Sequence, residues 1–116
     1  STQATENLID GKLFNRMDPG ACFINMGRGR TVNEDDLAEA LRTGTIRAAA
    51  SDVFDTEPLP EDSPLWDLEN MIITPHVCGK SPSYMNRALE IIEHNLDVYT
   101  GGKGAMINVV HPETRY

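Results

Sequence analysis

Short apolar runs alternate with amphipathic segments along most of the chain. They predict three strands, over residues 21–26, 46–54 and 71–75. The first run, 21–26, is compact and bounded by glycines, as is typical of a buried parallel strand. The run Ala48–Ala50 fits helix or strand by propensity alone. Its place between a capped helix and a proline-rich loop favours a strand.

Three helices are predicted between and after these strands, over about 10–17, 34–43 and 83–99. Asp10 and Asn33 stand where side chains that cap helix N-termini are expected. The third helix has apolar residues at helical spacing, namely Tyr84, Met85, Ala88, Leu89, Ile92, Leu96 and Tyr99. Helices that alternate with short strands predict a parallel α/β sheet.

Three parallel strands make an incomplete sheet, because both faces and one edge need cover. The chain has 116 residues, does not begin with Met, and opens in a polar stretch. We therefore expect it to be part of a longer protein.

The composition narrows the possible functions. The formal net charge is −8, and 40% of the residues are hydrophobic, which is too apolar for a disordered segment. The acidic balance argues against nucleic acid as a partner. No apolar run is long enough for a membrane span or a signal peptide, so no membrane partner is expected. Two cysteines do not make a disulfide framework, and the cytoplasm is the expected location.

Each predicted strand ends in a residue that can carry chemistry. Arg28 stands in a Gly-Arg-Gly turn after the first strand, Glu57 precedes a proline after the second, and His76 follows the third. Taken singly, they fit a surface turn, a solvated carboxylate and a structural histidine. Ligands gather at the carboxyl ends of parallel strands, however. Together these residues offer an anion clamp, an orienting carboxylate and an acid/base, which favours a functional site.

Other candidate motifs are weaker. Asp52 lies in an apolar strand, where an unpaired carboxylate is costly, so it needs a partner. The cysteines and histidines have no metal-ligand spacing, and we predict no metal. The chain also lacks the G-x-G-x-x-G loop that usually binds a dinucleotide pyrophosphate.

Three motifs resemble the signatures of the D-isomer-specific 2-hydroxyacid dehydrogenases. They are Asn25-Met26-Gly27-Arg28-Gly29, the run from Asp52 to Leu59, and Thr74-Pro75-His76-Val77-Cys78-Gly79. The resemblance implies part of a Rossmann-type doubly wound parallel sheet, with three strands and flanking helices but without the glycine-rich first half. Residues 1–100 then form the C-terminal half of an NAD(P)-binding domain. Residues 101–116 form a tail that returns toward the substrate domain.

The same resemblance implies hydride transfer between NAD(P)H and a small 2-oxo acid such as glyoxylate or hydroxypyruvate. Arg28 would clamp the carboxylate and carbonyl, His76 would protonate the carbonyl oxygen, and Glu57 would favour the imidazolium. The cofactor would be NAD or NADP, with Asp52 accepting from the nicotinamide carboxamide. The other residues expected around the nicotinamide are Met26, Gly27, Arg28, His76 and Gly79.

The resemblance leaves some alternatives open. Glu57 argues against formate as substrate, because the related formate dehydrogenases carry Gln there. Corepressor relatives keep a similar triad, so a non-catalytic dinucleotide-binding or interaction module is the alternative function. Arg30 either adds a second charge at the cleft or is solvated. The full-length protein is expected to be a homodimer, and this chain alone is expected to be inactive.

Overall fold

The computed structural model describes residues 2–110. The chain divides into two compact units, Ser1–Cys78 and Gly79–Tyr116. The first unit holds every residue predicted to act in the site except Gly79.

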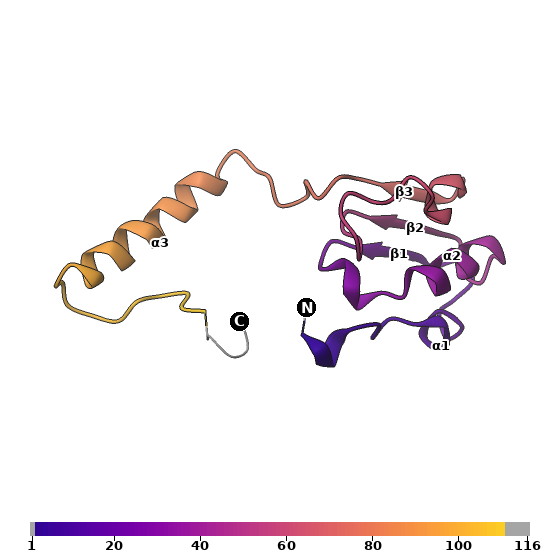
Figure 1. The fold of residues 1–116 in the computed structure, drawn as a ribbon, viewed down its shortest axis with the longest axis horizontal. Coiled ribbons are helices and arrows are strands. Elements are labelled where there is room, and N and C mark those ends of the chain that lie inside the picture. Colours follow the sequence, from indigo (N-terminus) through magenta and orange to yellow (C-terminus); the bar gives the residue numbers. More distant parts are fainter. Residues whose placement is uncertain (1, 111–116) are drawn as a thin grey trace. The chain divides into compact units, whose positions relative to one another are not determined.

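The first unit is built on a three-stranded parallel sheet in the order β1-β2-β3 (Figure 1). The strands are β1 (Cys22–Asn25), β2 (Ala48–Ser51) and β3 (Met71–Ile73), so all three predicted strands are confirmed. Each is shorter than the apolar run that predicted it. The second strand ends at Ser51, whose hydroxyl donates to the Val53 carbonyl in the segment that follows.

Helices α1 (Gly11–Phe14) and α2 (Glu34–Arg42) begin at the predicted caps. The side chains of Asp10 and Asn33 accept hydrogen bonds from backbone N–H groups three residues further on, at 3.1 and 3.0 Å. Gly44 follows α2 with φ +71°, the left-handed conformation that often ends a helix. The helix predicted over 10–17 is only one α-helical turn, because the N–H groups of Arg16 and Met17 bond three residues back, to the carbonyls of Leu13 and Phe14.

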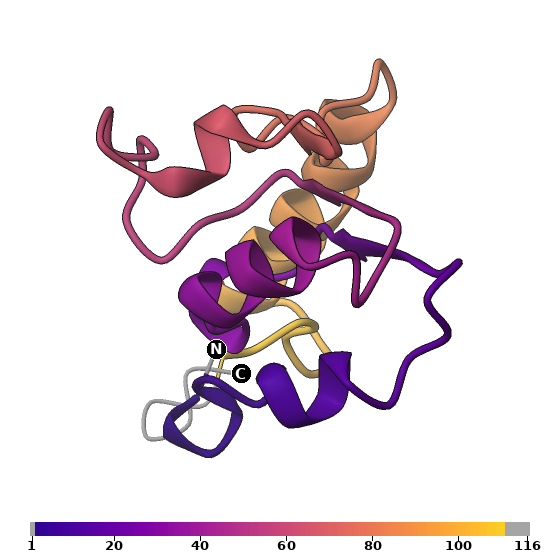
Figure 2. The same ribbon diagram turned by 90° about the vertical axis from the view of Figure 1, so that its right-hand side faces the viewer.

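Helices α1 and α2 are neighbours (Figure 2) and bury their apolar sides with one face of the sheet. The Phe14 ring of α1 meets Phe23 of β1 edge-on, with 5.4 Å between ring centroids. The core consists of Phe14, Val32, Leu37, Ala38, Ala40, Leu41, Ile46, Ala49, Phe54, Leu59 and Leu65. This packing anchors the strands whose carboxyl ends carry the candidate site.

The opposite face of the sheet is open to solvent. Ile24 and Ile72 are 63% and 65% exposed, and the register places them in one row with Ala50. The expectation that β1 is a buried strand is therefore wrong for this chain. The physical reason is that α1 and α2 both pack on the other face.

The second unit contains the long helix α3 (Tyr84–Tyr99), which confirms the helix predicted over 83–99. None of its residues is buried. The chain after α3 folds back on the helix, because the Asn95 side chain both donates to and accepts from the backbone of Ile107, at 2.9 and 2.8 Å. His94 Nε2 lies 3.0 Å from the Ala105 carbonyl. Among the helices of residues 2–110, none has the length and apolarity to cross a bilayer.

Candidate active site

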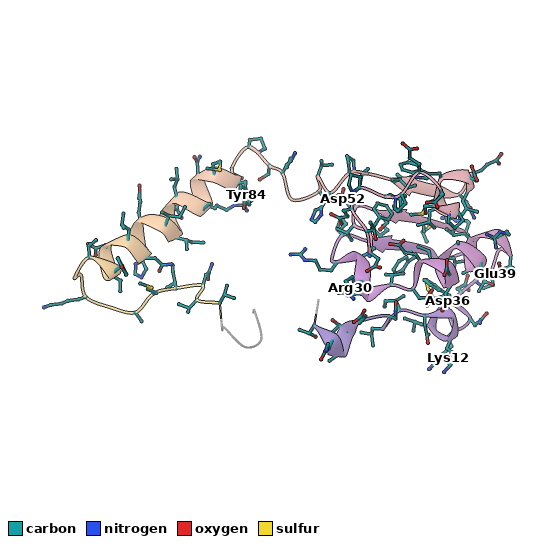
Figure 3. All side chains as sticks on the ribbon, in the orientation of Figure 1. Lys12, Arg30, Asp36, Glu39, Asp52 and Tyr84 are labelled. Atoms are coloured by element: carbon teal, nitrogen blue, oxygen red, sulfur yellow. The ribbon has the colours of Figure 1, made fainter. Side chains whose placement is uncertain are left out.

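The predicted catalytic residues all follow the carboxyl ends of the strands. Arg28 comes after β1, Glu57 after β2 and His76 after β3. Figure 3 shows Asp52, which directly follows β2, and Arg30, from the turn after β1, at this end of the first unit. The parallel topology therefore brings chain segments far apart in sequence to one edge, as predicted.

Glu57 and His76 form a hydrogen-bonded pair. His76 Nδ1 lies 2.7 Å from Glu57 Oε2, and the side chains are 49% and 38% exposed for His76 and Glu57. The other carboxylate oxygen, Oε1, accepts the Phe54 N–H at 3.0 Å. Both oxygens are thus held, and the imidazole is oriented with Nε2 as the nitrogen that can meet a reacting group.

The electrostatics of this pair favour an ionised carboxylate. The hydrogen bond to His76 is the main cause that lowers the pKa of Glu57, and the Phe54 N–H lowers it further. An ionised carboxylate accepts a hydrogen bond from the imidazole Nδ1–H and so fixes the orientation of the ring. The pair therefore has the chemistry of a general acid/base with an orienting anion.

His76 sits in strained backbone. Its φ is +53°, in the left-handed region that residues other than glycine seldom adopt. Such a conformation persists where surrounding contacts hold it. The loop that carries His76 is held by Asp52.

Asp52 is 3% exposed, and its carboxylate accepts three hydrogen bonds from this loop. Oδ1 accepts from the Thr74 hydroxyl at 2.5 Å and the Val77 N–H at 2.9 Å, and Oδ2 accepts from the Cys78 N–H at 2.8 Å. Burial raises the pKa of Asp52, but the three hydrogen bonds together outweigh it and hold the pKa well below its ordinary value. The buried Asp52 carboxylate is expected to need a hydrogen-bonding partner, and in the structure that partner is the loop that carries His76. No local pattern signals this contact.

Replacing Asp52 with Asn is expected to destabilise the fold at neutral pH, because an amide cannot accept from all three donors. A lowered folded-state pKa stabilises the protein above the ordinary value of 3.8, and this stabilisation is lost as the pH falls toward the folded-state pKa. The urea midpoint of unfolding should therefore be much lower for Asp52→Asn than for wild type near pH 7, and the difference should be smaller at about pH 3. Asp62→Asn, at an exposed carboxylate, is the control. Equal midpoints for wild type and Asp52→Asn near pH 7 would contradict this assignment.

A cavity of about 400 Å³ opens beside the Glu57–His76 pair. Apart from the pair, Asp52 and Thr74, its lining is apolar and comes from Phe54, Pro58, Leu59, Trp66, Ile73 and Pro75. The Trp66 indole N–H donates to the Pro60 carbonyl at 2.8 Å, which ties the 64–67 turn to the loop after Glu57. The acid/base pair thus borders a space that can admit a small molecule.

Arg28 is exposed, and its guanidinium donates to the Gly27 carbonyl at 2.8 Å. It lies at the same edge of the sheet as Glu57 and His76 but makes no hydrogen bond to either in the described part of the chain. The other residues expected at the nicotinamide, Met26, Gly27 and Gly79, are also exposed. A Cβ added at Gly79 would meet no atom within 4 Å.

Arg30 is solvated, since its side chain is 58% exposed, so one of the two expectations for it holds. Its guanidinium pairs with Glu6 at 2.6 Å and with Asp55 at 3.2 Å. These partners lie far from it in sequence, so no local pattern identified them. Across residues 2–110, no three His, Cys, Asp or Glu side chains gather as metal ligands would.

An open parallel sheet with flanking helices and an acid/base pair at its carboxyl edge defines part of a Rossmann-type domain. Residues 1–78 match the family model described as D-isomer specific 2-hydroxyacid dehydrogenase, NAD binding domain. The chain therefore belongs to the D-isomer-specific 2-hydroxyacid dehydrogenase family, and its matched part is NAD-binding domain. The family resemblance of the three motifs is confirmed.

Curated relatives include reductases of 2-oxo acids. Glyoxylate/hydroxypyruvate reductase B from Pectobacterium atrosepticum is 53% identical over 76 residues, which is 66% of this chain and 24% of the relative. Human glyoxylate reductase/hydroxypyruvate reductase is 42% identical over 95 residues, covering 82% of this chain and 29% of the relative. The chain thus spans between about a quarter and a third of these relatives.

Solved structures agree on the fold. A D-isomer specific 2-hydroxyacid dehydrogenase from Xanthobacter autotrophicus Py2, in complex with NADPH and MES, matches with a TM-score of 0.85 and 36% identity, over 100% of this chain and 47% of that one. An NADPH-dependent glyoxylate/hydroxypyruvate reductase from Sinorhizobium meliloti, in complex with NADP and sulfate, matches with a TM-score of 0.84 and 30% identity, over 100% of this chain and 37% of that one. These matches confirm the Rossmann-type sheet.

Proposed function

We propose that the protein carrying this chain is an NAD(P)-dependent D-2-hydroxyacid dehydrogenase that reduces a small 2-oxo acid such as glyoxylate or hydroxypyruvate. The observation that carries the proposal is the 2.7 Å contact between Glu57 and His76 at the carboxyl edge of the sheet. The names of the relatives support this substrate class. Arg28, Glu57 and His76 are the proposed catalytic residues.

In the proposed reaction, Arg28 binds the carboxylate of the 2-oxo acid through two parallel hydrogen bonds and lies within reach of its carbonyl oxygen. The nicotinamide, when bound, supplies the hydride. As the electron pair of the carbonyl moves onto its oxygen, Arg28 stabilises the developing negative charge. His76 gives its proton from Nε2 to that oxygen, and the Glu57 carboxylate stabilises the imidazolium until the transfer.

The residues present fit the nicotinamide end of the cofactor. Asp52, which the family resemblance assigns to the nicotinamide carboxamide, follows β2 directly and lines the cavity beside His76. Met26, Gly27, Arg28, His76 and Gly79 are the other residues that we assign to this pocket. From the same family resemblance, we propose that the full-length protein is a cytoplasmic homodimer. Sedimentation tests the oligomeric state, and cell fractionation tests the location.

The decisive experiment measures oxidation of NADH and NADPH by the full-length protein in the presence of glyoxylate or hydroxypyruvate. Turnover with either acid supports the proposal. If the protein binds the cofactor tightly but shows no turnover with any combination of acid and cofactor, the proposal is overturned. That result supports the alternative, a non-catalytic dinucleotide-binding module.

Replacing Glu57 with Gln is expected to shift the pH dependence of reduction. Gln removes the negative charge beside the proton donor, so the alkaline limb of the kcat profile is expected to move to lower pH. The limb is measured with saturating NADPH between about pH 6 and pH 9. Glu61→Gln, at an exposed carboxylate in the same loop, is the control. A limb that stays in place would remove Glu57 from its role.

The 116-residue chain by itself is expected to show no turnover with any of these acid and cofactor pairs. The reason is that it holds no G-x-G-x-x-G loop to bind the cofactor pyrophosphate. The assay compares equal molar amounts of this chain and the full-length protein. Reductase activity in the chain alone would overturn the prediction.

A further inference from the structure

Two segments at the carboxyl edge of the sheet come into unusually close contact. A Cβ added at Gly29 would lie 1.8 Å from the carbonyl carbon of Phe54, 2.0 Å from its oxygen and 2.4 Å from the nitrogen of Asp55. Gly29 is buried, and its φ is not in the left-handed region, so the requirement for glycine is one of space. Only a residue without a side chain lets the turn after β1 lie against this backbone.

Asp55 makes two further links between the same segments. Glu34, the first residue of α2, accepts the Asp55 N–H at its Oε1 at 2.7 Å. Arg30 Nε lies 3.2 Å from Asp55 Oδ1. The turn after β1, the start of α2 and the segment after β2 thus form one connected unit, which we call the 29–34–55 clamp after Gly29, Glu34 and Asp55.

The clamp joins the two halves of the proposed site. Arg28 directly precedes Gly29 on one side of the contact. On the other side, the Phe54 N–H donates to Glu57 Oε1, and Glu57 Oε2 bonds His76. A continuous path of backbone contact and hydrogen bonds therefore runs from the Arg28 turn to the imidazole.

We propose that Gly29 and Glu34 are positioning residues that set the spacing between the Arg28 guanidinium and the Glu57–His76 pair. The inference rests on the proposed function, in which one small substrate must meet both groups at once. Displacement of such groups by about 1 Å typically costs up to 10²-fold in rate. Neither residue touches the substrate, so each acts only through the catalytic groups.

The first test uses Gly29→Ala in the full-length protein. Its methyl group must push the two segments apart, and kcat/KM for the 2-oxo acid should fall roughly tenfold or more. Gly11→Ala is the matched control, because a Cβ there lies 3.4 Å from the nearest atoms of the Asp36 side chain, an ordinary contact. Wild-type kcat/KM in folded Gly29→Ala would overturn the role of Gly29.

The second test compares Glu34→Gln with Glu34→Ala. Gln keeps an oxygen that can accept the Asp55 N–H and Ala does not, so catalysis should decrease in the order wild type, Gln, Ala. The Ala variant should also show a higher KM for the 2-oxo acid and an alkaline limb at lower pH, since both Arg28 and Glu57 are loosened. Glu39→Ala, on the exposed side of α2, is the control. A merely structural role for Glu34 would lower the melting temperature and leave KM and the pH limb of the folded protein unchanged.

The outcomes separate the clamp from the function on which it rests. If Gly29→Ala fails to fold, the comparison of Glu34→Gln with Glu34→Ala tests the clamp. Reduced catalysis in Arg28→Lys and His76→Ala, with unchanged KM and pH limb in Glu34→Ala, overturns the clamp alone. Unchanged turnover in all of these variants overturns the proposed function and the clamp with it.

Discussion

Alanine in place of His76 is expected to lower the turnover of 2-oxo acid reduction by roughly 10²-fold or more, the usual contribution of a general acid. Without the imidazole, the carbonyl oxygen must take its proton from water. The dissociation constant for NADPH should change little, because a single ring at the nicotinamide end contributes a small part of the binding surface. Steady-state kinetics and a fluorescence titration of NADPH give the two quantities.

His94→Ala is the matched control for this variant. His94 is an exposed histidine on α3 whose hydrogen bond within the described residues is to the Ala105 carbonyl. Its replacement should leave turnover unchanged. If His76→Ala keeps wild-type turnover, His76 is not the acid and the Glu57 contact serves only to hold the loop.

The second large effect is expected from Arg28→Lys. Lys keeps the positive charge but cannot make two parallel hydrogen bonds to a carboxylate, and charge-assisted hydrogen bonds are among the strong ones. Loss of one such bond, at about 1.5–3 kcal/mol, corresponds to a fall in kcat/KM of roughly 10- to 150-fold. Both KM and kcat should change, because the same cation meets the carboxylate and the developing charge on the carbonyl oxygen.

Arg42→Lys is the control for the loss of a guanidinium. Arg42 is exposed at the end of α2, where it pairs with Glu39. The measurement is kcat/KM for glyoxylate and hydroxypyruvate at fixed NADPH. Arg28→Lys with wild-type values for both acids would show that the carboxylate is bound elsewhere.

Local signals in the sequence are reliable here because they act over a few residues. Asp10 and Asn33 cap their helices as predicted, and the apolar runs form three parallel strands. The three strands are shorter than the apolar runs that predicted them. Apolar side chains continue past the strand ends into the buried loop at Val53 and Phe54, where the backbone leaves the sheet.

Long-range contacts explain what sequence reasoning missed at the site. The missed contacts join residues 21 to 26 positions apart, as between Glu34 and Asp55 or between Asp52 and Cys78. Whether two loops meet depends on the strand register and on the path that each loop takes after its strand. The hydrophobic periodicity of the sequence predicts neither the register nor the loop path. The open face of the sheet is a similar case, because the apolar run of β1 does not reveal how many helices cover it.

The sequence alone determined the parallel α/β class, the family and the order of Arg28, Glu57 and His76 at the strand ends. These follow from hydrophobic patterning and short motifs, which are properties of neighbouring residues. The folded chain determined that Asp52 holds the His76 loop and that Arg30 pairs with Glu6 and Asp55, and it contains the Glu57–His76 contact that the family resemblance implies. Hydrogen bonds act only within about 3 Å, so they exist only once packing has brought distant segments together.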